Sequence, residues 1–306
     1  MSQDNRYPVA ILLATYNGSA YLEEFLESLC MQSFRQFRVY VRDDGSTDNT
    51  LDLIAGYKGR LDIQLIASEQ RLGAAKSFFE LLRRAPGHQY YMFADQDDYW
   101  YPNKIARVVS AMEGCTEEIV LYCSRLEYVD SQLRHLSYSR RPRLLSFENA
   151  VVENIATGCT VAIKSVVIGE VLAREPYDVV MHDWWLYMYC SAFGRIIYDP
   201  EASIKYRQHG GNAIGAAVGP IDDFRRRWRR YITQGGGVHP LSRQAQAFLE
   251  CYKSKLSRSH RSILERVVDG KKTWKARVSL FLSPPVSRQS RIDSFIMRFL
   301  FLLGRY

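Results

Sequence analysis

The stretch YYMFADQDDYW at residues 90–100 places three aspartates directly after a run of apolar residues. Asp95, Asp97 and Asp98 carry like charges within four positions, and their repulsion costs stability unless a cation or a hydrogen-bond network offsets it. Carboxylate oxygens are the ligands that Mg²⁺ and Mn²⁺ prefer, and such ions bridge carboxylates to phosphates. A lone pattern of this kind fits an acidic surface turn equally well, so the surrounding sequence has to decide between the two interpretations.

Strands and helices alternate through the first hundred residues. Apolar runs that end in polar or glycine-containing turns predict strands, and apolar residues at three- and four-residue spacing predict helices. The predicted strands are Val9–Ala14, Phe37–Val41, Asp62–Ala67 and Tyr90–Ala94, and the predicted helices are Tyr21–Ser33, Asp48–Tyr57 and Ala74–Arg84. This alternation predicts an α/β fold with a doubly wound, mostly parallel, Rossmann-like sheet.

A polar cluster follows three of these predicted strands, at Thr15–Gly18, Asp43–Asp48 and Asp95–Asp98. Ligands of doubly wound sheets bind beyond the carboxyl ends of the strands, so we expect the three clusters to meet at one site. The carboxylate of Asp43 can accept hydrogen bonds from a base or a ribose hydroxyl. Asp48 is better explained as a cap of the following helix.

The rest of the chain is less regular and then becomes basic and helical. Strands are predicted at Ile119–Tyr128, Cys159–Ile163, Ile196–Tyr198 and Ile204–Tyr206, with a helix at Tyr187–Phe193. Further helices are predicted at Asp222–Gln234, Leu241–Ser257, Ser259–Val268, Trp274–Leu282 and Ser290–Leu303. We therefore predict an α/β domain over residues 1–214 and a basic helical C-terminal extension over residues 215–306.

Charge is divided unevenly between these two parts. The formal net charge is +8, yet residues 215–306 hold 19 Lys and Arg against 6 Asp and Glu, while the remainder holds 22 basic and 27 acidic residues. A basic extension on an acidic body predicts an anionic partner, either nucleic acid or an anionic membrane surface.

Cysteine spacing and hydropathy predict a cytoplasmic protein that does not span a membrane. None of the six cysteines forms a CxxC pair or has zinc-site spacing, which favours reduced thiols. Met1–Tyr7 lacks the apolar core of a signal peptide. The longest apolar candidate, Phe295–Leu303, is too short for a membrane span and is interrupted by Arg298.

Six motifs follow one another along the chain. They are Ala14-Thr15-Tyr16-Asn17-Gly18, Arg42-Asp43-Asp44-Gly45-Ser46-Thr47-Asp48, Asp95-Gln96-Asp97-Asp98-Tyr99-Trp100, Thr157-Gly158, His182-Asp183-Trp184-Trp185 and Tyr206-Arg207-Gln208-His209. Together they resemble the motifs of glycosyltransferase family 2, over roughly residues 7–214 and in the same order. More narrowly, they resemble the bacterial rhamnosyltransferase-like branch that builds cell-surface polysaccharides such as O-antigen.

The resemblance implies a GT-A fold and roles for the matching residues. Asp183 would be the catalytic base, and Asp97 and His209 would bind Mg²⁺ or Mn²⁺. His182, Trp184 and Trp185 would contact the acceptor. The implied donor-binding residues are Thr15, Tyr16, Asp43, Asp44, Asp95, Gln96, Gly158 and Arg207.

Reaction chemistry agrees with these roles. Displacement at an anomeric carbon needs a base on the acceptor hydroxyl, opposite the leaving group, and an Asp can serve. The leaving nucleoside diphosphate develops charge that a divalent ion, or a cation such as Arg207, stabilises. One carboxylate base without a second nucleophile fits inversion. Two alternatives stay open: His182 and Asp183 as a helix cap above core tryptophans, and His209 as an ordinary histidine.

The arginine-rich stretch RRRWRRY at residues 225–231 has three interpretations. Arginines and aromatic residues can bind nucleic acid, but no nucleic-acid fold motif accompanies them, so we expect no nucleic-acid partner. A solvated helix face is the second interpretation. The third is a basic helix at an anionic bilayer, with Phe295–Leu303 dipping into the interface. These apolar residues fit packing on the first domain or a homo-oligomer contact as well.

We therefore expect a metal-dependent, inverting glycosyltransferase at the inner face of the cell membrane. The expected reaction moves L-rhamnose from dTDP-rhamnose to a saccharide acceptor, carried on an isoprenoid diphosphate. A UDP-hexose is the alternative donor, because the choice of base and sugar depends on pocket shape. The alternative of another class is a non-catalytic protein that binds an anionic surface or nucleic acid.

Overall fold

The computed structural model describes residues 7–67, 70–174, 179–208 and 240–306, which belong to two compact units. The first unit comprises Met1–Arg141, Ile155–Ala173 and Met181–Arg207, and the second comprises Pro142–Asn154, Arg174–Val180 and Gln208–Tyr306. Residues 142–154 therefore group with the C-terminal helices and not with the sheet. The predicted domain boundary after residue 214 lies outside the described residues.

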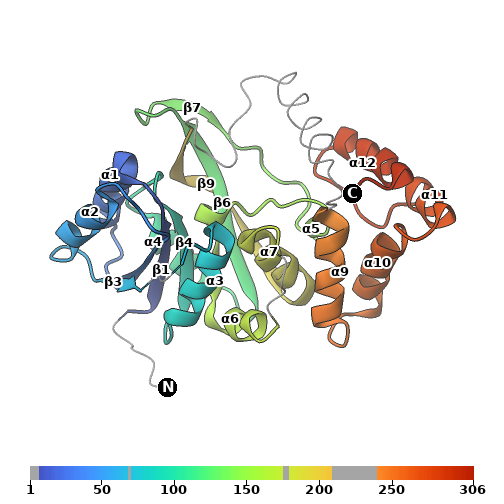
Figure 1. Ribbon diagram of the computed structural model, residues 1–306, viewed down its shortest axis with the longest axis horizontal. Helices are drawn as coiled ribbons and strands as arrows, with labels where there is room; N and C mark the ends of the chain where they lie inside the picture. Colours follow the sequence, from blue (N-terminus) through green and yellow to red (C-terminus); the bar gives the residue numbers. More distant parts are fainter. Residues whose placement is uncertain (1–6, 68–69, 175–178, 209–239) are drawn as a thin grey trace. The chain divides into compact units, whose positions relative to one another are not determined.

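Within the described residues, nine strands form one sheet in the first unit, in the order β3-β2-β1-β4-β8-β6-β9-β5, with β7 paired to β6 (Figure 1). Parallel pairing joins β3, β2, β1 and β4, and also β6 and β9, whereas β8, β5 and β7 pair antiparallel. The bounds are β1 Val9–Thr15, β2 Phe37–Asp43, β3 Ile63–Ile66, β4 Tyr90–Asp95, β5 Tyr99–Trp100, β6 Val120–Val129, β7 His135–Tyr138, β8 Ala162–Lys164 and β9 Arg195–Arg207. The predicted α/β fold with a mostly parallel sheet is confirmed.

Helices cover both faces of this sheet. On one face, α1 (Ser19–Cys30), α2 (Thr50–Tyr57) and α4 (Lys104–Glu113) share a buried cluster with alternate residues of β1. Because successive side chains of a strand point to opposite faces, the other residues of the strands face the second layer. There α3 (Ala74–Arg84) packs on β4, with the rings of Phe78 and Phe93 5.4 Å apart. The helices α6 (Ser165–Leu172) and α7 (His182–Phe193) contact α3 in the same layer.

The middle of the chain differs from the sequence predictions in three places. The helix predicted from Tyr187 begins at His182, so His182 and Asp183 lie in its first turn. Residues 195–207 form one strand where two were predicted, because irregular pairing with β6 accommodates Pro200. Cys159 lies in a 3-10 turn, Gly158–Thr160, and not in a strand. The elements that the sequence analysis missed are α4, α6, β5, β7 and α5 (Phe147–Ala150).

The second unit is helical, as predicted for the C-terminal part of the chain. Its helices α9 (Pro240–Tyr252), α10 (Arg258–Asp269), α11 (Trp274–Leu282) and α12 (Arg291–Leu303) appear orange to red in Figure 1. The ring of Phe147 in α5 lies 5.9 Å from Phe248 of α9 and 4.5 Å from His260 of α10. The helix predicted at 222–234 lies outside the described residues. No helix of the described residues is long and apolar enough to cross a membrane.

Gly194, between α7 and β9, is required because the chain passes very close to Ile119, the residue before β6. A side-chain carbon at this position would lie 2.0 Å from the carbonyl oxygen of Ile119. We expect Gly194→Ala to lower the free energy of unfolding by about 1–3 kcal/mol, since backbone has to move to relieve the clash. Urea unfolding followed by circular dichroism measures this change.

Gly56→Ala is the matched control. A side-chain carbon at Gly56 would meet no atom within 4 Å, and the residue lies inside α2. Alanine costs less conformational entropy than glycine in a helix, so this variant should gain up to about 1 kcal/mol. Equal destabilisation by both substitutions would contradict the explanation from close approach.

Candidate active site

Side-chain hydrogen bonds join the carboxyl ends of β1 and β2. Thr15 and Asp43 are in register as the last residues of the two strands, and Thr15 Oγ1 donates to Asp43 Oδ1 at 2.8 Å. Asp43 also accepts hydrogen bonds from the backbone N–H groups of Gly45 and Ser46 and from the Ser46 hydroxyl. Thr15 and Asp43 are both buried. The carboxylate of Asp43 thus shapes the turn after β2, and its contact with a nucleotide stays a prediction.

The turns after β1 and β2 are tied to each other. The backbone N–H of Asn17, a residue in the left-handed region at φ 45°, donates to Ser46 Oγ at 2.8 Å. Asp48 accepts hydrogen bonds from the backbone N–H groups of Ser19 and Thr50, where α1 and α2 begin. This carboxylate therefore acts at helix starts, in line with its interpretation as a cap.

Arg42 and Asp44 form a buried ion pair behind these turns. Arg42 Nη1 donates to Asp44 Oδ1 at 2.6 Å and to Ser77 Oγ of α3 at 2.8 Å. Asp44 also accepts from the backbone N–H groups of Leu72 and Gly73. Burial alone would raise the pKa of Asp44, but the hydrogen bonds from Arg42 and the two amides lower it below its ordinary value. The pair fixes residues 70–73 against the end of β2.

Tyr16 is the exposed member of this cluster, with 38% of its surface accessible. The guanidinium of Arg71 lies 3.9 Å from the centroid of its ring. Arg71 was missed by the sequence analysis because it belongs to an irregular segment after β3 that carries no motif of its own. Only the fold brings it onto Tyr16.

Gln96 is bound to the backbone of the turn after β1. Its Oε1 accepts from the N–H of Tyr16 and its Nε2 donates to the carbonyl oxygen of the same residue, both at 3.0 Å. A side-chain carbon at Gly18 would lie 2.2 Å from Gln96 Oε1, so glycine leaves the space that the amide fills. The structure therefore shows Gln96 positioning Tyr16.

The acidic turn after β4 is crowded and largely withdrawn from solvent. Oxygens of Asp95 and Asp98 and the Sγ of Cys159 lie within 4.8 Å of one another. Burial, and then the charges of Asp97 and Asp183, raise the pKa of Asp95 to about 7. Asp98 is fully buried, and burial together with its acidic neighbours raises its pKa well above the ordinary value. Its Oδ2 has no hydrogen-bond partner in the part of the chain that the structure describes.

Lys104 is a buried cation near this acidic turn. It is the first residue of α4, and its Nζ has no hydrogen-bond partner among the described residues. The ammonium lies 4.7 Å from the centroid of the Trp100 ring. Burial lowers its pKa to about 8, against the opposing effects of Cys159 and Asp98. Sequence reasoning missed this residue, since a lysine at a helix start normally lies in solvent.

Asp183 lies in the first turn of α7 beside Gly158. The residue is 4% exposed, and its Oδ1 accepts from the backbone N–H of Trp184 at 2.6 Å. A side-chain carbon at Gly158 would lie 3.6 Å from Asp183 Oδ2. The next residue, Cys159, reaches the acidic turn, and the charge of Asp183 acts on Asp95. The structure therefore places Asp95, Gly158 and Asp183 near one another, and their roles in donor binding and catalysis stay predictions.

The three predicted acceptor residues differ in exposure. His182 is buried, with its ring centroid 4.1 Å from Phe78 and 5.0 Å from Phe93, and burial lowers its pKa to about 3. Its ring is therefore neutral at physiological pH. Trp185 is fully buried, whereas Trp184 is half-buried. Of these three residues, only Trp184 has appreciable surface to offer an acceptor.

Arg207, the last residue of β9, is fully buried against the acidic turn. Its Nε donates to the carbonyl oxygen of Asp97 at 2.9 Å, and its backbone N–H donates to Asp98 Oδ1 at 3.3 Å. The guanidinium also binds the Ser131 carbonyl and pairs with Glu24. These contacts fix the acidic turn.

His209, the predicted metal ligand, and the arginine-rich stretch 225–231 lie outside the described residues.

The model of the family Glycosyl transferase family 2 matches residues 10–173, which is more than half of the chain. The chain belongs to glycosyl transferase family 2. The match spans β1 to α6 and so includes the turns after β1, β2 and β4, together with Gly158. The chain is thus a glycosyltransferase, as the sequence motifs predicted.

Among curated proteins, the chain is 28% identical over 237 residues to the dTDP-rhamnosyl transferase RfbG of Shigella flexneri, covering 71% of this chain and 77% of that protein. It is 22% identical over 240 residues to an uncharacterized glycosyltransferase of Rickettsia typhi, covering 76% and 74%. These similarities extend the likeness beyond the residues that the family model matches.

Solved structures of glycosyltransferases share the fold. S. aureus TarS in complex with UDP-GlcNAc aligns with a TM-score of 0.58 at 17% identity, over 97% of this chain and 92% of that one. The mannosyltransferase PcManGT from Pyrobaculum calidifontis, in complex with GDP-Man and Mn²⁺, aligns with a TM-score of 0.52 at 19% identity, over 99% and 87%. The predicted GT-A fold is confirmed by this likeness.

We expect Arg42→Met to lower the free energy of unfolding by about 3–5 kcal/mol, because it leaves the buried carboxylate of Asp44 without its cation. The pKa of Asp44 is lower in the folded state than in the unfolded state. The ionised carboxylate therefore stabilises the folded state fully at pH values above the unfolded pKa, and this stabilisation is lost as the pH falls through the folded pKa. Without Arg42 the folded pKa rises, and the loss begins at a higher pH. Urea unfolding across a pH series measures both effects.

Arg71→Met is the matched control for this prediction. Arg71 is exposed and its Nε lies 4.0 Å from Asp44 Oδ2. An exposed pair of this kind contributes at most about 1 kcal/mol. If the two variants lose the same stability, the buried pair does not have the structural role described above.

Proposed function

We propose that this glycosyltransferase moves L-rhamnose from dTDP-rhamnose to a hydroxyl group of a saccharide acceptor, with inversion at the anomeric carbon. The observation that carries the proposal is the convergence of Asp183 with the acidic turn at residues 95–98, beside Gly158. The similarity to a dTDP-rhamnosyl transferase supports the choice of donor. Family membership supports an enzyme over the non-catalytic alternative.

Asp183 is the base in the proposed reaction. It accepts the proton of the acceptor hydroxyl while that oxygen forms a bond to the anomeric carbon and the bond from that carbon to the nucleoside diphosphate breaks. Asp183 lies in the first turn of α7, where the backbone N–H of Trp184 donates to its Oδ1 at 2.6 Å. A single displacement assisted by one base inverts the configuration.

The acidic turn fits a divalent cation, which we propose to be Mg²⁺ or Mn²⁺. Carboxylate oxygens suit these hard ions, and the buried Oδ2 of Asp98 has no hydrogen-bond partner among the described residues. The thiol of Cys159 suits them poorly. Asp97 and His209 stay the proposed ligands, from the family resemblance. When bound, the ion would offset charge on the leaving diphosphate.

The turns after β1 and β2 form the proposed donor site, with Thr15, Asp43 and Asp44 as its frame. Tyr16 and Arg71 offer an exposed, flat, cationic surface on which a base can stack. Gly158 lets the His182 ring and the Asp183 carboxylate lie close to its backbone, because a side-chain carbon there would be 3.2 Å from His182 Nε2 and 3.6 Å from Asp183 Oδ2. We assign Gln96 and Arg207 a positioning role, since their polar groups bind the protein's own backbone.

A UDP-hexose is the second candidate donor. TarS has been solved with UDP-GlcNAc, and its fold matches over almost the whole length of this chain. Thymine and uracil have the same hydrogen-bonding groups on the edge that carboxylate and backbone groups of a protein can contact. The exposed stacking surface of Tyr16 and Arg71 accommodates either base.

We propose that the acceptor is a saccharide carried on an isoprenoid diphosphate, in the synthesis of a cell-surface polysaccharide. Such an acceptor places the enzyme at the inner face of the cell membrane. Residues 1–214 would provide catalysis, and the basic residues of 215–306 would meet the anionic surface.

The test of the proposed function is donor binding and turnover by the full chain. We expect dTDP-rhamnose to bind in the presence of Mn²⁺, as measured by calorimetry, with slow release of dTDP. Chelation with EDTA should weaken binding, because the diphosphate then meets the acidic turn without a cation. UDP-GlcNAc is the competing donor. Absence of binding by every nucleotide sugar, with and without Mn²⁺, would refute the proposal.

We expect Asp183→Asn to lower kcat by about 10²–10⁴-fold, the usual contribution of a general base, while the dissociation constant of the donor changes little. Asp52→Asn is the matched control, because Asp52 is an exposed carboxylate in the first turn of α2. Single-turnover transfer and calorimetry separate chemistry from binding. Loss of donor binding in the Asp183 variant alone would move this residue from base to a structural role.

A further inference from the structure

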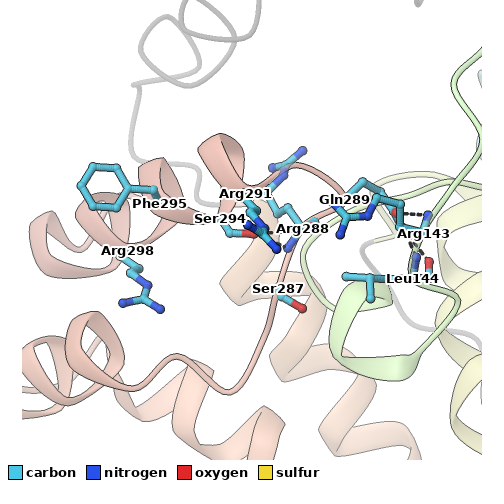
Figure 2. A pocket seen from close by; sticks show the side chains of 9 residues that line it. All are labelled: Arg143, Leu144, Ser287, Arg288, Gln289, Arg291, Ser294, Phe295 and Arg298. Carbon is cyan, nitrogen blue, oxygen red and sulfur yellow. Dashed lines mark hydrogen bonds between the residues drawn. The ribbon is translucent and has the colours of Figure 1, made fainter.

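A cationic cavity of about 500 Å³ lies in the second unit (Figure 2). It is formed by the residues that lead into α12, by the first two turns of α12, and by Arg143 and Leu144 from the segment before α5. Figure 2 shows Phe295 and Arg298 on α12 and Gln289 reaching the backbone of residues 143 and 144. Four of its lining residues are arginines: Arg143, Arg288, Arg291 and Arg298.

The positive charge of this cavity is mostly unbalanced. Arg288 pairs with Glu153 at 3.4 Å. The side chains of Arg143, Arg291 and Arg298 form no hydrogen bond or ion pair with the described residues. Arg143 and Arg291 are exposed and Arg298 is half-buried, so all three guanidinium groups are accessible to an anion that enters the cavity. The amino end of α12 also lies at the cavity, and its partial positive charge adds to that of the arginines.

Hydrogen bonds hold the walls of the cavity in place. The backbone N–H groups of Arg143 and Leu144 donate to Gln289 Oε1 at 2.7 and 3.0 Å. The Nε2 of Gln289 donates to Asn149 Oδ1 at 2.9 Å. The backbone N–H of Arg288 donates to Ser294 Oγ at 2.9 Å. The arginines therefore project from a fixed frame, which lowers the entropic cost of binding an anion.

An apolar stripe runs along α12 from this cavity. The stripe consists of Ile292, Phe295, Phe299, Leu302 and Leu303, whose side chains are 37–66% exposed. Their spacing of three and four residues places them on one face of the helix. Arg291 and Arg298 precede two members of the stripe and line the cavity beside it. Arginines along one edge of an apolar stripe are typical of a helix that lies in the interface of a bilayer.

We propose that this cavity binds the phosphate headgroup of an anionic lipid, while the apolar stripe of α12 contacts the acyl chains. Charge complementarity supports a phosphate, and the exposed apolar side chains next to it support a lipid over a soluble anion. The helix is too short to span the membrane, so the chain would lie on its surface. This inference rests on the proposed membrane location alone and is independent of the donor and of the reaction.

The first experiment measures binding of the full chain to vesicles of phosphatidylglycerol mixed with phosphatidylcholine. Each arginine near an anionic surface contributes about fivefold in affinity, so Arg291→Gln combined with Arg298→Gln should lower vesicle affinity by about 25-fold. Lys253→Gln combined with Arg258→Gln removes the same charge from exposed positions outside the cavity, and should lower it far less. An equal loss in both double variants would overturn the proposal in favour of general surface charge.

The second experiment distinguishes a lipid from other occupants. Phe295→Ala should weaken vesicle binding and leave the affinity for inorganic diphosphate unchanged, because only the acyl-chain contact is lost. If Phe295→Ala has no effect on vesicles while diphosphate binds and depends on Arg291 and Arg298, the cavity is a soluble-anion site. If Phe295→Ala instead dissociates a dimer in light scattering, the stripe is a contact between two copies. Either result overturns the lipid assignment.

Donor binding by the same variants separates this inference from the proposed function. The double variant of Arg291 and Arg298 should bind dTDP-rhamnose as the unmodified chain does, because the donor residues belong to the first unit. Failure of the unmodified chain to bind any nucleotide sugar would end the proposed function and leave the vesicle result standing. Thermal melting confirms that each variant is folded.

Discussion

Electrostatic repulsion within the turn after β4 is the constraint on which the site depends. Asp95, Asp97 and Asp98 lie close together, and Asp98 is fully buried. The fold offsets part of this cost with two buried cations, Lys104 at the start of α4 and Arg207 at the end of β9. The pKa values of Asp95 and Asp98 are raised by the burial and charge that remain, and this crowding of carboxyl groups is the reason we propose a divalent ion at this turn.

In the turns after β1 and β2, which form the proposed donor site, the carboxylates are hydrogen-bonded by the protein itself. Asp43 and Asp48 accept backbone N–H groups, and Asp44 is paired with Arg42. These bonds make the turns after β1 and β2 rigid and leave Tyr16 and Arg71 as the accessible groups. Rigid turns reduce the entropic cost of holding a nucleotide. The carboxylates of the first two turns therefore shape a surface, whereas those of the turn after β4 form the proposed cation site.

The two units also divide the charge of the chain. The acidic turn and Asp183 belong to the first unit, whereas the cavity with its four arginines belongs to the second. A nucleotide diphosphate and an anionic lipid would thus be recognised by opposite means, one through a cation and the other by arginines directly. Catalysis alone does not explain why the C-terminal region is basic, whereas the proposed binding of an anionic lipid does.

The sequence by itself determined the strands β1 to β4, the helices α1 to α3 between them and the location of the acidic turns, because apolar runs and helical spacing are local signals and parallel strands bring their carboxyl ends to one edge. The family resemblance gave the prediction that Asp183 is the catalytic base, and this stays a prediction. Only the tertiary structure decided that His182 and Trp185 are buried and that Gln96 and Arg207 bind backbone. It also decided that Lys104 lies near the acidic turn and that Arg71 lies over the ring of Tyr16. These outcomes depend on which side chains meet across long stretches of chain, and burial is set by that packing and not by local sequence.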